Sequence, residues 1–98
     1  MDFEKIAPKN FEWDEKKRFS NIKKHGIDFK DAIDVFYNLV QRRIDDRVDY
    51  GEERYIALGQ MKELINAHVF TKRNDNIRII SVRKANKKER EQYRSAVE

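Results

Sequence analysis

The stretch LINAHVFTKRNDNIRIISVRK, residues 64–84, decides the fold of this 98-residue chain. It contains two runs rich in β-branched and aromatic residues, 64–72 and 77–83, separated by a short polar segment. A two-residue turn at Asp75-Asn76 would join the two runs as an antiparallel hairpin. The second run is apolar in its middle and has an arginine near each end. This pattern predicts a central strand that fills a core and also holds an anionic partner.

The expected turn determines which side chains share a face of the sheet. It pairs His68 with Arg83 and Arg73 with Arg78, and a second turn at 62–63 adds the strand at 54–61. One face should then carry the core, which helix 28–37 is expected to cover: Ile56, Leu58, Ile65, Ala67, Val69, Ile80 and Val82. The opposite face should carry a mixed polar and aromatic set: Tyr55, Ala57, Gly59, Asn66, His68, Phe70, Ser81 and Arg83. Arg78 and Arg83 are expected to point to opposite faces, with Arg83 beside Ser81.

The rest of the chain predicts an α+β fold. A short strand is expected at 10–13, a helix from 14 to 25, a second helix after Asp28, a further strand at 40–45, and a helix to 97 that starts with an Asn86–Glu89 capping box. The expected architecture is a mostly antiparallel sheet of four to five strands, with two N-terminal helices on one face and a C-terminal helix. Residues 1–98 are expected to form one domain, with 1–9 as a flexible lead.

Charge is distributed unevenly along the chain. Residues 54–98 carry 11 Lys and Arg against 5 Asp and Glu, whereas residues 1–53 carry 11 against 13. A cation-rich half favours a polyanionic partner such as RNA or DNA, although a solvated surface explains it equally well.

Several classes of protein do not fit the composition. The chain has no cysteine, so disulfides and thiolate metal sites are not expected. It also has no signal-peptide pattern and no long apolar run, so no membrane span is expected. We therefore expect a cytoplasmic location. The acidic pairs at 45–46 and 52–53 lack a histidine cluster, and the glycines form no phosphate loop. We therefore expect no metal and no cofactor.

Three segments resemble the BrnT toxin family. They are FEWDEKKRFSNIKKHGIDFKDAIDVF (residues 11–36), DYGEERYIALG (49–59) and RIISVRKANKKEREQY (78–93). The resemblance implies a RelE-like fold and a toxin of a type II toxin–antitoxin system that cleaves RNA and blocks translation. It also implies neutralisation by a BrnA-type antitoxin, a DNA-binding protein encoded by the adjacent gene, so that DNA is contacted only through the complex.

Metal-independent RNA cleavage needs proton transfer and stabilisation of the phosphorane, for which histidine and arginine are suited. The candidate catalytic residues are His25, Arg83 and Arg73, with His68 as a second possible proton-transfer group. Arg73 and Arg78 are expected to face each other as an RNA clamp. The candidate RNA-binding residues are Lys17, Asn21, Lys24, Arg54, Arg78, Ser81 and Lys84.

A non-catalytic nucleic-acid binder and a degenerate toxin that only binds an antitoxin are alternatives. The RNA target, ribosome dependence and stoichiometry of the complex are left open.

Overall fold

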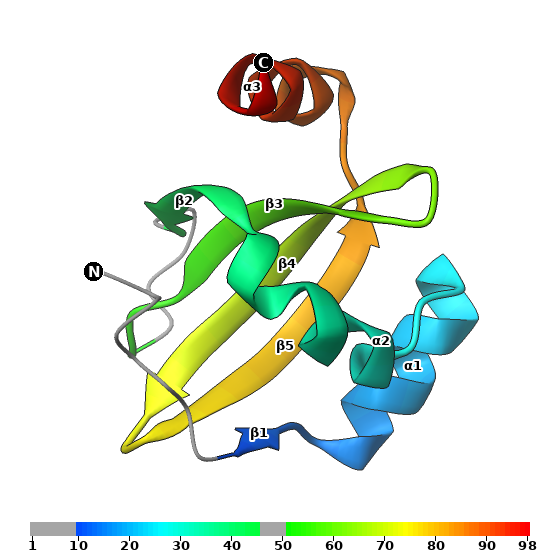
Figure 1. The fold of residues 1–98 in the computed structure, drawn as a ribbon. Coiled ribbons are helices and arrows are strands. Elements are labelled where there is room, and N and C mark those ends of the chain that lie inside the picture. Colours follow the sequence, from blue (N-terminus) through cyan, green and yellow to red (C-terminus); the bar gives the residue numbers. More distant parts are fainter. Residues whose placement is uncertain (1–9, 46–50) are drawn as a thin grey trace.

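The computed structural model describes residues 10–45 and 51–98, so the expected flexible lead at 1–9 lies outside the described residues. The strands are β1 (Phe11–Glu12), β2 (Val40–Ile44), β3 (Tyr55–Met61), β4 (Leu64–Arg73) and β5 (Asn76–Lys84). The helices are α1 (Glu15–His25), α2 (Phe29–Val35), the short 3-10 helix η1 (Phe36–Asn38) and α3 (Lys87–Val97) (Figure 1). This order confirms the predicted α+β class. The RelE-like label stays a prediction.

The helix boundaries follow from capping. Asp14 accepts hydrogen bonds from Lys16 N and Lys17 N at the start of α1, and Gly26 ends it in the left-handed conformation at φ 70°. Asn86 and Glu89 form the predicted capping box at the start of α3. Asp28 accepts from Lys30 N at the start of α2, so all three helix starts that the sequence predicted are confirmed.

The strands form one sheet in the order β1-β5-β4-β3-β2. Strands β2 to β5 are an antiparallel meander, as predicted, and the β3–β4 register pairs Leu58 with Ala67 and Ile56 with Val69 as expected. Strand β1 pairs parallel with β5, which makes the sheet mixed. The two-residue strand was predicted, but not its partner or direction.

The predicted β4–β5 register is wrong. The turn residues are Asn74 and Asp75, and Arg73 pairs with Asn76 instead of Arg78. Asn74 has φ 53°, a left-handed conformation that asparagine tolerates better than most residues, so the turn comes one residue early. Arg73 and Arg78 therefore do not pair across the turn as the expected RNA clamp requires.

A bulge in β5 changes the register again. Phe70 pairs with Ile79, but Val69 pairs with Ser81, so Ile80 is an extra residue. Beyond this point His68 pairs with Val82 and Ala67 with Arg83. The extra residue brings Arg78 and Arg83 to the same face, which corrects the prediction that they point to opposite faces.

The prediction of which face the helices cover is also wrong. Helix α2 and η1 cover the face that carries Ala57, His68, Phe70, Ile79 and Val82, as Figure 1 shows with α2 lying across the sheet. We call this the helix-covered face. Its core residues are Phe29, Ala32, Phe36, Leu39, Ala57, Phe70, Ile77, Ile79 and Val82.

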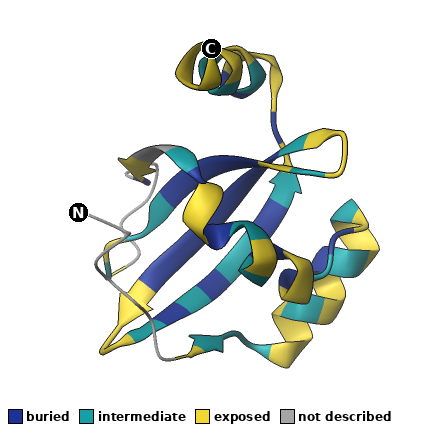
Figure 2. Cartoon of the chain, in the orientation of Figure 1, coloured by how far each residue is buried: buried dark blue, intermediate teal, exposed yellow. Residues whose placement is uncertain are grey.

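The opposite face carries the apolar set that was expected under α2. Ile56, Leu58, Ala67 and Val69 form a separate buried cluster against which Ile80 and Tyr93 of α3 pack. The central strands β3 and β4 are consequently buried over most of their length, whereas α1 and α3 are largely exposed (Figure 2). Both faces have a core, and the chain is not a simple two-layer structure.

Asn21 attaches α1 to the free edge of β5. Its side-chain amide donates to Val82 O at 2.8 Å and to Ile27 O at 2.9 Å, and its Oδ1 accepts from Val82 N at 3.2 Å. The amide thus pairs with the β5 backbone as a neighbouring strand would. These hydrogen bonds hold the middle of α1 beside β5 at Val82.

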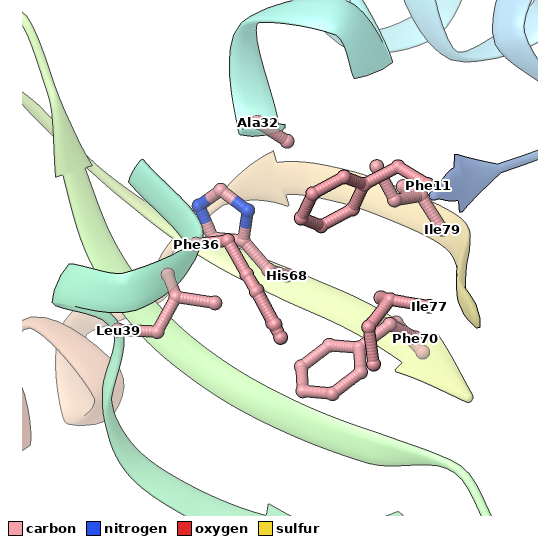
Figure 3. Close-up of a pocket in the computed structure, with 9 residues that line it drawn as sticks. Phe11, Ala32, Phe36, Leu39, His68, Phe70, Ile77 and Ile79 are labelled. Atoms are coloured by element: carbon pink, nitrogen blue, oxygen red, sulfur yellow. The ribbon is translucent and has the colours of Figure 1, made fainter. Parts of the chain in front are cut away.

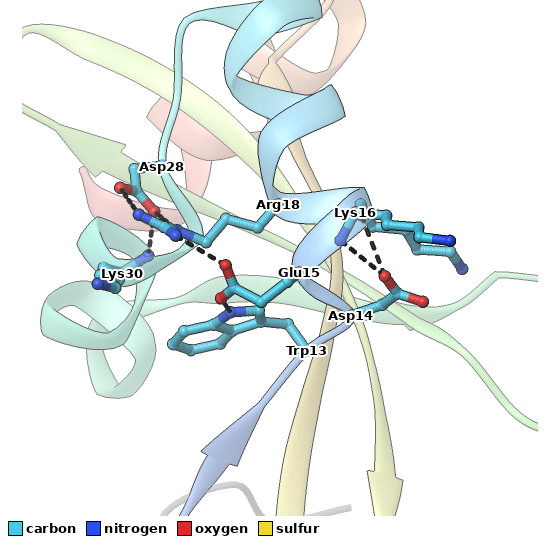
Figure 4. Close-up of polar contacts among 8 residues, drawn as sticks. Trp13, Asp14, Glu15, Lys16, Arg18, Asp28 and Lys30 are labelled. Carbon is cyan, nitrogen blue, oxygen red and sulfur yellow. Dashed lines mark hydrogen bonds and ion pairs between the residues drawn. The ribbon is translucent and has the colours of Figure 1, made fainter.

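The start of α2 is tied to α1 by an ion-pair network (Figure 4). Arg18 donates to both carboxylate oxygens of Asp28 at 2.8 and 3.0 Å, and to Glu15 at 3.0 Å. Trp13 Nε1 donates to the same Glu15 at 2.7 Å. The Arg18 hydrogen bonds lower the pKa of Asp28 to about 2.

Candidate functional site

Within the described part of the chain, five arginines share the face of the sheet opposite α2, and we call this the arginine face. Strand pairing places Arg43, Arg78 and Arg83 there, because they lie opposite Ile56, Thr71 and Ala67 respectively. Alternation along β3 and β4 adds two more. The five are Arg43, Arg54, Arg73, Arg78 and Arg83.

Among the described residues, three glutamates lie within ion-pair distance of these arginines. Glu52 lies 3.8 Å from Arg54 and 3.5 Å from Arg73, and Glu12 lies 3.4 Å from Arg78. The third, Glu89, contacts the remaining two. Arginines outnumber these glutamates, and the Arg73 side chain is 48% exposed, so the face retains cationic groups that an anion can reach.

Glu89 makes the tightest of these contacts. Its two carboxylate oxygens accept from Arg83 Nη1 at 2.7 Å and Nη2 at 3.0 Å, while Arg43 Nη2 lies 3.7 Å away. Oε1 also accepts from Asn86 N at 2.9 Å. Burial alone would raise the pKa of Glu89, but the hydrogen bonds from Arg83 and Asn86 lower it, so the carboxylate is ionised.

A cleft of about 210 Å³ separates α1 from β5. We call it the α1–β5 cleft, and its lining residues are Lys17, Ser20, Asn21, Lys24, His25, Ile80 and Ser81. Two lysines and a histidine thus surround a space that can hold an anion. Ser81 lies two residues from Arg83, on the same face, so the cleft adjoins the arginine face.

The structure brings together most of the residues predicted for the site. Lys17, Lys24, His25 and Ser81 meet in the cleft, and Arg54, Arg73, Arg78 and Arg83 lie on the arginine face. Asn21 also lines the cleft but is only 5% exposed, and its amide is engaged with the backbone. Lys84 pairs with Asn66, which puts it on the helix-covered face, away from the other residues.

The two histidines lie in different places. His68 is 3% exposed on the helix-covered face, among Phe11, Ala32, Phe36, Leu39, Phe70, Ile77 and Ile79 (Figure 3). Its Nε2 has no hydrogen-bond partner among the described residues, and burial lowers its pKa to about 4. The predicted pairing of His68 with Arg83 was wrong, and of the two histidines it is His25 that lines the α1–β5 cleft together with Ser81.

Sequence reasoning missed two residues of the site. Arg43 faces Ile56 only because of an irregularity in β2 between Val40 and Arg43, which has no sequence signal. Glu89 was predicted only as a capping residue. It lies six residues after Arg83 in the sequence, and this spacing did not indicate that the two side chains are in contact across the start of α3. The signal in the sequence was an acidic residue, Glu89, shortly after a predicted strand that ends at Arg83.

Two further structural findings concern the described residues alone. They contain no cluster of three or more His, Asp or Glu side chains that is placed to hold a metal ion. Within 10–45 and 51–98, no helix has the length and apolar character needed to cross a membrane.

Comparison with known proteins assigns the chain to a family. The family model described as "Ribonuclease toxin, BrnT, of type II toxin-antitoxin system" matches residues 13–89. The crystal structure of the Brucella abortus ribonuclease toxin BrnT matches with a TM-score of 0.62 and 30% sequence identity, over 80% of this chain and 97% of that one. No curated protein sequence matched the chain. The chain therefore belongs to the BrnT family and is a ribonuclease toxin of a type II toxin–antitoxin system, with an antitoxin as its partner.

Proposed function

We propose that the chain cleaves RNA without a metal ion, where the α1–β5 cleft meets the arginine face. The observation that carries this proposal is the position of Ser81. It lines the cleft together with His25 and lies on the same face as Arg83, so a phosphodiester near Ser81 is close to both side chains.

Each of these groups has a chemical task. The 2′-hydroxyl must lose a proton and the leaving 5′-oxygen must gain one, and imidazole is the side chain best suited to exchange protons near neutral pH. Arg83 stabilises the charge of the phosphorane, because a guanidinium donates two parallel hydrogen bonds to phosphate oxygens. Lys17 and Lys24 bind the RNA backbone at the cleft.

Arg73 has a different task in this proposal. It lies six residues along β4 from Ala67, the partner of Arg83, which corresponds to about 20 Å at the rise of a β-strand. Arg73 and Arg83 therefore cannot act on one phosphodiester. We assign Arg73, with Arg78 and Arg54, to binding the RNA strand beyond the cleavage point.

The antitoxin is proposed to cover the same surface. A BrnA-type partner with an acidic or amphipathic segment would neutralise the arginine face near Arg73, Arg78, Arg83 and α3, where cationic groups remain accessible. Its other part would bind DNA, so that the toxin contacts DNA only through the complex. We place the activity in the cytoplasm, where RNA substrates are found.

The test is cleavage of RNA by the purified protein in excess EDTA. We expect the wild type and Lys23→Ala, an exposed α1 residue outside the cleft, to cleave, and His25→Ala to cleave about 10²–10⁴ times more slowly. Cleavage that stops with EDTA and returns with a divalent ion would contradict the metal-free mechanism. Wild-type cleavage by His25→Ala would remove the cleft from catalysis.

Cleavage separates the enzyme from a non-catalytic binder, whereas the salt dependence of binding tests the contact with RNA phosphates. Both should bind RNA less tightly as salt rises, because each neutralised phosphate releases counterions. Binding with this salt dependence but no cleavage would favour the binding module. A flat salt response would mean that the arginine face does not contact phosphates.

A further inference from the structure

We propose that Glu89 is a positioning residue that presents one edge of the Arg83 guanidinium to the RNA. This inference rests on the role proposed for Arg83 and adds a residue to it. It starts from the way in which the guanidinium is shared between its neighbours.

A guanidinium has two edges that can each donate a pair of parallel hydrogen bonds. Glu89 occupies the edge formed by Nη1 and Nη2, at 2.7 and 3.0 Å, and Lys84 O accepts the other Nη1 proton at 3.3 Å. The edge formed by Nε and Nη2 has no partner among residues 10–45 and 51–98. Arg83 thus remains able to bind two phosphate oxygens while it is held by Glu89.

Glu89 is itself held rigidly, so it can fix the direction of Arg83. Its residue is 3% exposed, and Oε1 also accepts from Asn86 N at 2.9 Å in the capping box. The Arg83 side chain is 24% exposed, so part of it is reachable from solvent. A carboxylate fixed at a helix start therefore removes most of the rotational freedom of the arginine before RNA arrives, which is how preorganised donors contribute to catalysis.

The carboxylate also links Arg83 to Arg43. Arg43 Nη2 lies 3.7 Å from Oε2 of Glu89 and its side chain is 56% exposed, so this second contact is loose. Glu89 screens the repulsion between the two cations and allows both to stay near one phosphate. The same negative charge weakens the attraction of both arginines for RNA.

These two effects predict an unusual signature for Glu89→Gln. One of the two acceptors becomes an NH₂ group that faces an N–H donor of Arg83, so the guanidinium loses its orientation and kcat should fall about ten- to a hundredfold. Loss of the negative charge should tighten RNA binding about two- to fivefold, measured with a 2′-deoxy analogue that cannot be cleaved. A purely structural role would not improve binding.

The matched controls lie on α3. Glu91→Gln makes the same charge change at an exposed residue of the same helix and should leave kcat unchanged. Asn86→Ala removes the side-chain cap but keeps the Asn86 N–H that donates to Glu89, so it should lower the melting temperature and reduce kcat much less than Glu89→Gln does. In the Arg83→Ala background, Glu89→Gln should have no further effect on the single-turnover rate.

Three outcomes would overturn the inference. Wild-type kcat in Glu89→Gln, while Arg83→Ala is impaired, would show that Arg83 needs no positioning. Rate losses that multiply in the double variant would show that Glu89 acts independently of Arg83. Weaker RNA binding together with a lower kcat would indicate a structural role.

Two more results complete the experiment. Wild-type cleavage by Arg83→Ala would instead contradict the proposed function on which the inference rests. If Glu89→Gln does not fold, Glu89→Asp replaces it: the charge remains, but the shorter side chain cannot satisfy Arg83 and Asn86 together. The aspartate variant should then lose kcat severalfold, and an unchanged kcat would overturn the inference.

Discussion

His68 and Arg83 lie on adjacent strands, one residue apart in register, and their surroundings are opposite. His68 lies on the helix-covered face among aromatic and aliphatic side chains, with its Nε2 unpaired among the described residues and its charged form disfavoured. Arg83 lies on the arginine face, where two charge-assisted hydrogen bonds to Glu89 stabilise its charge. The two faces of one sheet thus separate a neutral histidine from a charged arginine by little more than the thickness of the backbone.

The difference lies in what covers each face. On the helix-covered face, α2 and η1 place Phe36 and Leu39 against the sheet, and Leu39 approaches so closely that a Cβ at Gly59 would lie 2.6 Å from its Cδ2. On the arginine face, α3 contributes Tyr93 near the cluster around Ile56, and long charged side chains extend past it. Only a face that is partly covered can keep ionised groups solvated and available to a ligand.

Among the predictions that follow from this comparison, the largest effect is expected at Arg83. Arg83→Ala should reduce the single-turnover rate of RNA cleavage by about 10²–10³, because a transition-state donor is lost. Arg94→Ala, an exposed arginine of α3, is the matched charge control and should cleave as the wild type does. Arg83→Lys should fold and still lose most of the rate. An ammonium lacks the two edges with which a guanidinium can donate paired hydrogen bonds to Glu89 and to a phosphate at the same time.

This variant also tests the contrast between the two faces. Wild-type cleavage by a folded Arg83→Ala protein would mean that Arg83 is a structural partner of Glu89 alone. Circular dichroism and the melting temperature show whether the variant is folded. The active site would then have to be sought among the other arginines of this face.

The second prediction concerns the edge where the two faces meet. Asn21→Ala should lower the free energy of unfolding by about 3 kcal/mol or more, because three buried backbone groups lose their hydrogen-bond partner. Urea unfolding measures this loss, and Ser20→Ala, an exposed neighbour, should cost little. Unchanged stability with weaker RNA binding would instead support the RNA-binding role predicted for Asn21 from the sequence.

The third prediction uses the pKa of His68. Burial lowers this pKa from 6.5 to about 4, so the unfolded chain binds a proton in a pH range where the folded chain does not. The stability contributed by neutral His68 is complete above pH 6.5 and is lost as the pH falls toward 4, by about 3 kcal/mol in total. Urea unfolding between pH 7 and 4 should show this decrease, and His68→Gln should flatten it.

A His68→Gln variant that keeps the full decrease would contradict the assignment. The pKa of Asp28, lowered to about 2 by Arg18, causes a separate loss of stability that begins only below about pH 4. The two effects therefore occupy different pH windows and can be distinguished in one titration.

The sequence predicted the elements of this fold well because each has a local signal. Asp14, Gly26, Asp28 and the Asn86–Glu89 box all act within a few residues of the helix ends that they define. The β3–β4 register was predicted correctly, but the register of β5 and the face that α2 covers were predicted wrongly. The turn at Asn74 shifts the β5 partners by two residues and the bulge at Ile80 shifts them back by one, and neither has a local signal strong enough to detect.

The candidate site was predicted in part for the same reason. The cleft residues Lys17, Lys24 and His25 come from one helix, whose period groups them without any knowledge of the sheet. Arg43 and Glu89 reach the site from β2 and α3, so only tertiary structure could add them. The prediction that Val82 lies under α2 was correct. His68 was expected on the opposite, open face, but it shares the helix-covered face with Val82.

The smallest effect is expected at Arg73, at the end of the arginine face distant from the cleft. Arg73→Ala should leave kcat unchanged and weaken RNA binding severalfold at low salt, because the side chain is 48% exposed and only positions the strand. The slope of log K against log salt should become shallower by about 0.7–0.9, the value for one phosphate contact. Lys72→Ala, its exposed neighbour on the helix-covered face, should leave the slope unchanged, since alternation points it away from the RNA.

Equal effects of the two variants would mean that RNA binding depends only on the total charge of the hairpin. A large fall in kcat for Arg73→Ala would contradict the separate tasks assigned to Arg73 and Arg83 and return Arg73 to the catalytic group.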